Sequence, residues 1–219
     1  MVTTSIKILK KIPFSYLWLL ESSIGRAKTI IDVGCGDGEL MEILSNGKNW
    51  QIDGLEIYHN SVKKAQSRKI YQKIITGDLI KSCEKLVAKG QKYDVVFCSQ
   101  VIEHITRKDG QKLLKLADKL AKRRIVVGTP REFMIQPHEF LGGNPYQVHL
   151  SGWNDQDFIK RGYKVFGVGF KPIWSENGLA RARSKMVLTL LTVISFFVSP
   201  LIYFATPLAA GILCIKDKK

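Results

Sequence analysis

The sequence contains few cysteines and lacks a paired-cysteine motif. Its four cysteines are spread over 219 residues, and no two of them form C-x-x-C, which excludes a zinc ribbon and a redox dithiol. Internal repeats and low-complexity tracts are also absent, while 45% of the residues are hydrophobic. These features exclude a disordered tail, a collagen-like chain and a disulfide-stapled mini-protein. The sequence predicts a reduced protein that faces the cytoplasm and has one domain of ordinary size.

Acidic residues are scarce relative to basic ones. The 34 Lys and Arg residues outnumber the 19 Asp and Glu residues, which gives a formal net charge of +15. A charge of this size favours partners with negative surfaces, such as nucleic acid, acidic lipid or an anionic substrate. Charge alone leaves these three classes open.

Residues 186–215 contain no Lys, Arg, Asp or Glu. As a helix of about 1.5 Å per residue, the run would extend roughly 45 Å, too long for one upright span of about 30 Å and too short for two spans of about 20 residues. Pro200 and Pro207 are expected to break or kink it. Basic residues flank the run on both sides: Arg181, Arg183, Lys185, Lys216, Lys218 and Lys219. Because basic flanks prefer the cytoplasmic face, the pattern predicts a monotopic or re-entrant attachment through 186–207. The alternative is a buried helix, in which case the protein is cytoplasmic.

Upstream of this run, strand patterns alternate with helix patterns. Residues 1–27 predict a lead-in helix without the pattern of a signal peptide. Strands are expected at 28–34, 50–57, 73–76, 93–99, 124–129 and 162–170, and helices at 39–46, 60–68, 81–88, 109–121 and 154–160. We expect Asn60 to cap the second of these helices. The alternation predicts an α/β fold with a doubly wound, mostly parallel sheet of the Rossmann-like type. The stretch 130–152 shows no clear element, which is typical of a lid or a binding loop.

A glycine-rich loop follows the first expected strand. Its glycines are Gly34, Gly36 and Gly38, which let the chain turn sharply and let a ligand lie against the backbone. Glu39 stands where a dinucleotide site would have its third glycine. The carboxylates of Asp32, Asp37 and Glu39 would repel a pyrophosphate and attract an ammonium or sulfonium group. The loop therefore predicts a cationic ligand.

Two further acids lie at the ends of the next two strands. Glu56 is placed to accept hydrogen bonds from a ribose diol, and Asp78 could accept one from an adenine amino group. Acids at three successive strand ends predict a shared nucleoside site.

On these residues the chain resembles the class I S-adenosylmethionine-dependent methyltransferases. The resemblance extends over 28–170 through IIDVGCGDGEL, GLEI, TGDL and YDVVFCSQVIEHI. It implies a seven-stranded sheet, a methyltransferase domain at 28–180, and a last, antiparallel strand in GILCIK within the tail 209–219. The implied S-adenosylmethionine contacts are Asp32, Gly34, Gly36, Asp37, Gly38, Glu56, Ile57, Asp78, Leu79, Ser99 and Gln100.

The candidate catalytic residues are His104 and Glu103, just after the fourth strand. The segment V-I-E-H resembles that of the quinone-pathway O-methyltransferases and of the small-RNA 3′-terminal methyltransferases. Some of these families build a metal site here from two glutamates and two histidines, but Gln100 replaces the first glutamate, and we name no metal ligand. His104 remains open as a base, a ligand or a structural residue.

The loop NPYQVHLSGW resembles the acceptor-side loop of the same enzymes. It implies substrate-side roles for Tyr146, His149 and Trp153, with loop packing as the alternative for Trp153.

The expected function is methyl transfer from S-adenosylmethionine to a small or lipid-linked acceptor, through a hydroxyl, at the cytoplasmic side of a membrane. Two alternatives are an RNA-modifying methyltransferase, favoured by the net charge, and a scaffold that binds the cofactor without turnover. The sequence leaves the acceptor molecule and the oligomeric state open.

Overall fold

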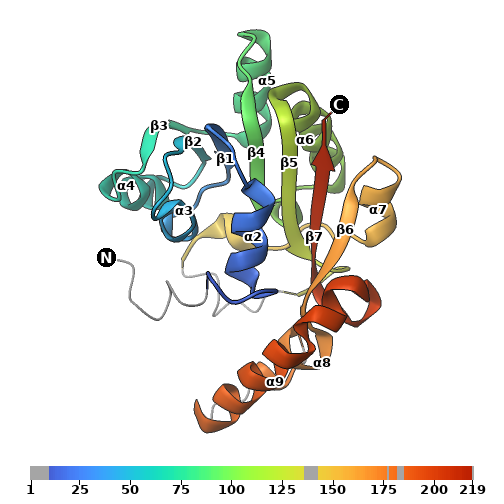
Figure 1. The fold of residues 1–219 in the computed structure, drawn as a ribbon. Helices are drawn as coiled ribbons and strands as arrows, with labels where there is room; N and C mark the ends of the chain where they lie inside the picture. The colour runs from blue at the N-terminus through green and yellow to red at the C-terminus, as the bar shows by residue number, and fades with distance from the viewer. Residues whose placement is uncertain (1–9, 136–142, 177, 182–184, 219) are drawn as a thin grey trace.

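The computed structural model describes residues 10–135, 143–176, 178–181 and 185–218 (Figure 1). Arg183 and Lys219, two of the predicted flanking cations, lie outside the described residues. The strands are β1 (Thr29–Val33), β2 (Gln51–Glu56), β3 (Tyr71–Thr76), β4 (Tyr93–Ser99), β5 (Ala121–Pro130), β6 (Lys164–Phe170) and β7 (Ala209–Asp217). They form one sheet in the order β3-β2-β1-β4-β5-β7-β6. Strands β1 to β5 pair in parallel, whereas β7 is antiparallel to both β5 and β6. The predicted fold class is confirmed.

Helices cover both faces of this sheet. The α-helices are α2 (Tyr16–Ile24), α3 (Glu39–Ser45), α4 (His59–Ser67), α5 (Leu79–Ala88), α6 (Arg107–Leu120), α7 (Asp155–Ile159), α8 (Lys171–Trp174) and α9 (Lys185–Phe204). Short 3₁₀ helices are η1 (Ile102–His104), η3 (Pro145–Gln147), η4 (Leu179–Arg181) and η5 (Thr206–Leu208). Alternation along β1 sends Ile30 to a core cluster with α2 and α3, and Ile31 to a second cluster with α5 and α6.

Side chains before several helices fix where those helices begin. Ser15 accepts a hydrogen bond from the Trp18 backbone at the start of α2, and Thr106 accepts one from Asp109 at the start of α6. The predicted cap at Asn60 is wrong. Helix α4 already begins at His59, so Asn60 lies in its first turn and its amide donates to the Tyr58 hydroxyl.

The hydrophobic run forms one helix and one strand. Helix α9 continues through Pro200, so the helix is not broken there; a kink at this residue remains a prediction. Among the described residues, 186–204 form one helix long and apolar enough to cross a membrane, and only 17% of its most apolar stretch is buried. The alternative of a buried core helix therefore does not hold. The last turns of α9 touch β6, where a Cβ on Gly167 would lie 2.1 Å from the Ile202 carbonyl oxygen, and its first turns project from the body (Figure 1).

The basic residues that follow the hydrophobic run lie on β7 or just after it. The direction of this strand places them far from α9. Lys216 and Lys218 lie 2.8 Å and 3.2 Å from the Asp118 carboxylate on α6. Their end of β7 pairs with the first half of β5, at the opposite edge of the sheet from α9. The antiparallel strand thus carries these lysines away from the hydrophobic helix and onto the sheet domain; that both basic flanks lie on the cytoplasmic side remains a prediction.

Candidate active site

The glycine loop lies directly against β2 and the segment after β4. The backbone N–H groups of Gly34 and Cys35 donate to the Leu55 carbonyl at 2.8 Å and 2.9 Å. Gly34 has φ of 71°, and a Cβ there would lie 2.5 Å from a methyl carbon of Val101. Gly36, with φ of 56°, would meet nothing within 4 Å. The loop thus leaves open space beside bare backbone at Gly36, which fits a ligand lying against it.

Glu56 connects this loop to the start of α4. Its buried carboxylate accepts hydrogen bonds from the backbone of Gly36 at 2.9 Å, Ile57 at 2.9 Å and Tyr58 at 2.8 Å. These three hydrogen bonds occupy most of the acceptor positions of the Glu56 carboxylate, and they hold the loop next to the end of β2. The diol contact predicted for Glu56 remains a prediction.

The acids around the loop differ in their surroundings. Asp32 is 4% exposed and accepts a hydrogen bond of 2.8 Å from the Tyr71 hydroxyl. Burial, together with the nearby charge of Glu56, raises the pKa of Asp32 to about 7. A bound cation at this position would lower that pKa and favour the carboxylate.

Asp37 and Glu39 contribute less to a cation site than the sequence predicts. Arg68 on the loop after α4 pairs with Asp37 at 3.4 Å and also binds Glu42, so the Asp37 charge is partly neutralised. The Asp37 carboxylate further accepts the backbone N–H of Glu39, which opens α3. No motif in the sequence indicates that Arg68 pairs with Asp37. The negative field of the loop therefore comes mainly from Asp32 and Glu56.

The other predicted cofactor contacts lie along the same edge of the sheet. Asp78 caps α5 by accepting the Lys81 N–H at 2.8 Å, and Leu79 is buried behind it. The Ser99 hydroxyl lies 2.8 Å from the Tyr16 hydroxyl of α2, a contact that the sequence analysis missed. The backbone of Gln100 has φ of 56°, a left-handed conformation that residues other than glycine adopt rarely and that is frequent at functional sites.

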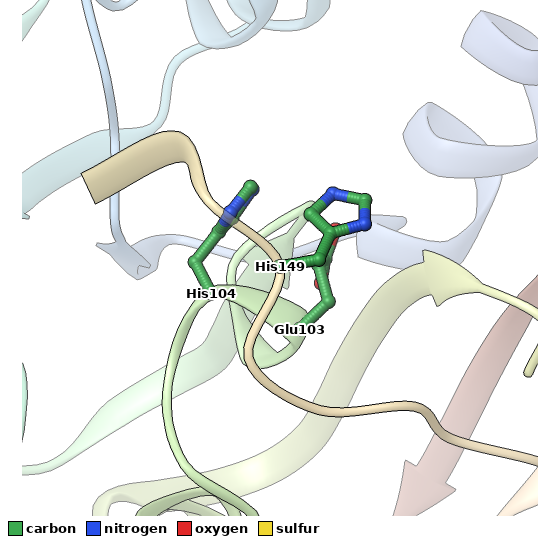
Figure 2. Close-up of side chains that lie close together, drawn as sticks. All are labelled: Glu103, His104 and His149. Atoms are coloured by element: carbon green, nitrogen blue, oxygen red, sulfur yellow. The ribbon is translucent and has the colours of Figure 1, made fainter. Parts of the chain in front are cut away.

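A second group of side chains forms where η1 meets the loop 143–153. Glu103, His104 and His149 each offer a ligand atom within 4.8 Å of the others (Figure 2). The His104 Nδ1 lies 3.3 Å from the Val148 carbonyl, and the His149 Nδ1 lies 2.6 Å from the Met134 carbonyl. Because a carbonyl only accepts hydrogen bonds, these contacts assign the proton to Nδ1 and leave each Nε2 as an acceptor.

The electrostatics of this group are unusual. Glu103 is 2% exposed; its Oε2 accepts a hydrogen bond from Thr129 at 3.0 Å, and its buried Oε1 has no partner among the described residues. Burial raises the pKa of Glu103 to about 7 and, together with His149, lowers the pKa of His104 to about 4. His104 is therefore neutral and a weak base at pH 7, while Glu103 can exchange a proton there.

The same donor set fits a divalent cation. An unpartnered carboxylate oxygen and two imidazole nitrogens are ligand types that Zn²⁺ accepts, and both rings are held by carbonyls on their other nitrogen. His149 comes from the distant loop because the backbone N–H groups of Leu150 and Ser151 donate to the Glu103 carbonyl.

The two remaining acceptor-side residues are placed differently. Tyr146 is exposed on η3, and its ring lies 6.5 Å from that of Tyr58, just after the end of β2. Trp153 is 1% exposed and donates to the Ser151 hydroxyl at 2.9 Å; a Cβ on Gly110 would lie 2.3 Å from its ring. Trp153 therefore packs in the core, which agrees with the packing alternative for this residue.

Comparisons with known proteins agree with this arrangement. A family profile described as a methyltransferase domain matches residues 30–124. The chain is 26% identical over 97 residues to the ubiquinone biosynthesis O-methyltransferase of Coxiella burnetii, covering 44% of this chain and 40% of that protein. It is 30% identical over 96 residues to the protein of the same description from Salmonella paratyphi A, covering 43% and 38%. The chain thus matches about two-fifths of the length of these curated relatives.

Solved structures resemble the whole chain. A SAM-dependent methyltransferase from Archaeoglobus fulgidus has a TM-score of 0.57 at 20% identity, covering 99% of this chain and 100% of that one. Magnesium protoporphyrin IX methyltransferase from Synechocystis, solved with bound SAH, has a TM-score of 0.53 at 15% identity, covering 100% and 89%. At these identities the likeness establishes the fold. Residues 30–124 thus match the methyltransferase-domain family, and the chain as a whole has the fold of the S-adenosylmethionine-dependent methyltransferases.

Proposed function

We propose that the protein transfers a methyl group from S-adenosylmethionine to a hydroxyl of a small or lipid-linked acceptor at a membrane surface. The observation that carries the proposal is the adjacency of two groups of side chains. Val101 packs against Gly34 of the glycine loop and lies two residues before Glu103 of the second group. A donor beside the loop and an acceptor beside Glu103 would therefore meet at the end of β4.

The residues divide the chemistry between them. S-adenosylmethionine, when bound, supplies a methyl group activated by a positively charged sulfur. Asp32 and Glu56 place negative charge at the donor side, and Ser99 and Gln100 form the floor between donor and acceptor. As the methyl group moves from the donor sulfur to the acceptor oxygen, Glu103, whose pKa of about 7 suits that transfer, would take the proton of the hydroxyl. The two histidines position the hydroxyl.

Attachment to a membrane is supported by the exposed apolar surface of α9. Large apolar side chains on this helix face solvent, and the most exposed are Met186, Leu190, Phe197, Leu201 and Phe204. Contiguous apolar surface of this kind is uncommon on soluble monomers and is typical of interaction sites. We infer that α9 lies in the bilayer surface and that its last turns hold the domain there, since β7 returns directly to the sheet.

The proposal is tested by following a labelled methyl group from the donor into the fractions of a cell lysate. Purified protein is incubated with donor labelled in its methyl group and with fractionated cell lysate, and lipid, small-molecule, RNA and protein fractions are counted separately. We expect label in the lipid or small-molecule fraction, lost in His149→Ala and retained in His59→Ala, which removes an exposed histidine of α4. Label only in RNA would establish the alternative suggested by the net charge. Donor binding without label in any fraction would establish a scaffold.

A further inference from the structure

A largely apolar cavity of about 620 Å³ opens at the carboxyl edge of the sheet. Pockets that bind small organic ligands typically measure about 300–1,000 Å³. The wall comes from α2, β6, β7, α8 and α9, and from the end of β5 with the segment after it; its apolar side chains include Leu17, Met134, Val168, Trp174 and Phe196. The cavity is thus large enough for a ligand and is bounded mostly by hydrocarbon.

The hydroxyl groups in this wall are already engaged. Trp174 donates to the Ser195 hydroxyl at 2.7 Å, and Ser199 donates to the Ser195 carbonyl at 2.6 Å. Thr192 donates to the Leu188 carbonyl at 2.8 Å. Because these groups bond within α9 or to α8, the α9 wall offers little hydrogen bonding to a ligand and favours an apolar one.

One end of the cavity borders the candidate active site. Gln100 lies in its wall and follows Ser99 directly. Met134, also in the wall, receives the His149 hydrogen bond on its carbonyl. Pro130 lines the cavity too and follows Thr129, whose hydroxyl donates to Glu103. A molecule in the cavity would therefore have one end at Gln100, next to the segments that bond Glu103 and His149.

The other end borders the exposed surface of α9. Phe196 lines the cavity and is also 40% exposed, so this side chain belongs both to the wall and to the outer surface. Phe197, the next residue, is among the most exposed apolar side chains of the helix. An apolar chain could therefore pass from a lipid surface into the cavity past α9 without leaving apolar surroundings.

We propose that this cavity binds the single hydrocarbon chain of an amphipathic acceptor and holds its hydroxyl-bearing head at Gln100 and His149. The inference rests on the proposed function and narrows its acceptor to a molecule with an apolar tail. The occupant is one chain rather than a whole bilayer surface, since the cavity measures only about 620 Å³ and residues of both α2 and α9 line it.

The test uses a long-chain bromoalkanol, because bromine quenches tryptophan fluorescence at contact and Trp174 lies in the wall. The full chain is titrated below the concentration at which the probe aggregates. We expect saturable quenching that is lost in Trp174→Phe. Thr192→Phe and Ser199→Phe each add a ring to the cavity and should weaken binding by about tenfold or more. Val193→Phe adds the same ring on α9 at a position outside the cavity wall and should bind as the parent does.

Two outcomes would overturn the inference. Quenching that does not saturate, or equal affinity in all three α9 variants, would assign the probe to the outer surface of the helix. Circular dichroism and melting temperature identify any variant that has not folded. Because Thr192 and Ser199 are both substituted, the test does not depend on either variant alone.

A separate assay with short, tail-less alcohols distinguishes the two proposals. Methylation of these without saturable probe binding would reject the cavity alone, and saturable binding without methylation of any acceptor would reject the activity alone.

Discussion

The side chain of Val101 lies against the backbone of Gly34, so closely that a Cβ on this glycine would be 2.5 Å from a Val101 methyl carbon. The contact joins the loop after β1 to the segment after β4 and fixes the distance between donor and acceptor sides. Positive φ at Gly34 adds strain to any substitution.

The glycines of the loop should therefore respond differently to alanine. Gly34→Ala should lower the free energy of unfolding by more than about 2 kcal/mol, because steric overlap adds to backbone strain. Gly36→Ala should lose only about 1–2 kcal/mol from its positive φ, yet lose donor affinity. Gly47→Ala is the control, since Gly47 has positive φ, open space and no place in the site. Urea unfolding and titration calorimetry measure both effects, and equal donor affinity in Gly36→Ala and Gly47→Ala would contradict the loop assignment.

Glu56→Ala should weaken donor binding by roughly 1.5–3 kcal/mol, or about ten- to a hundredfold, through loss of charge-assisted hydrogen bonds. The structure adds a second effect, because three backbone N–H groups lose their acceptor. Glu56→Gln keeps one acceptor oxygen and should recover part of the stability but little of the affinity. Calorimetry on both variants tests this, and unchanged donor affinity in Glu56→Ala would reject the ribose assignment.

The raised pKa of Asp32 predicts a specific pH dependence. Asp32 has an ordinary pKa near 3.8 and a native pKa of about 7, so the native state holds a proton that the unfolded chain has released between these values. The free energy of unfolding should therefore fall as pH rises from about 4 to 7. Asp32→Asn should remove this part of the slope and be more stable than the parent at pH 8. Glu103 contributes in the same direction, whereas the lowered pKa of His104 contributes a rise over this window. The free energy of unfolding should therefore no longer fall with rising pH in the double variant with Glu103→Gln.

Donor binding should have the opposite dependence on pH. Below about pH 7 a growing fraction of Asp32 carries a proton and attracts a cationic donor less. Affinity should therefore drop as pH falls from 8 to 6 in the parent and stay flat in Asp32→Asn. A parent affinity that is constant over this range would contradict a sulfonium beside Asp32.

The group around Glu103 predicts binding of a divalent cation. Zn²⁺ should raise the melting temperature of the parent, because binding to the native state alone stabilises it. The rise should be lost in His149→Ala and kept in His59→Ala. Isothermal titration with Zn²⁺ checks the stoichiometry, and an equal rise in both variants would show binding elsewhere.

Charged substitutions on the outer surface of α9 should release the protein from vesicles. Leu190→Glu combined with Phe197→Glu changes two exposed side chains and leaves the contact of the last turns with β6 in place. The parent should float with vesicles of mixed neutral and anionic lipids, and the variant should not. Ile159→Glu, at an exposed apolar position on α7, is the control. Flotation of the α9 variant would reject attachment through this helix.

Strands, helices and the glycine loop could be predicted because their signals are local. The alternation of Ile30 and Ile31 between two faces, and the acid at each strand end, are visible in a few consecutive residues. Contacts between distant segments left no such signal. Arg68 meets Asp37, and Met134 meets His149, only after the chain folds. The choice between packing and a substrate-side role for Trp153 was open for the same reason, since its burial is set by partners far along the chain.

The position of β7 after α9 has a consequence for how the protein is made. Until β7 is synthesised, β5 and β6 have facing edges with no strand between them, and an open edge of this kind readily pairs with other chains. The strand that closes the gap leaves the ribosome only after the apolar helix has done so. If α9 were threaded fully across a bilayer, β7 would be stranded in the wrong compartment and the gap would stay open. Correct assembly therefore requires α9 to stay on the same side of any bilayer as β5 and β6.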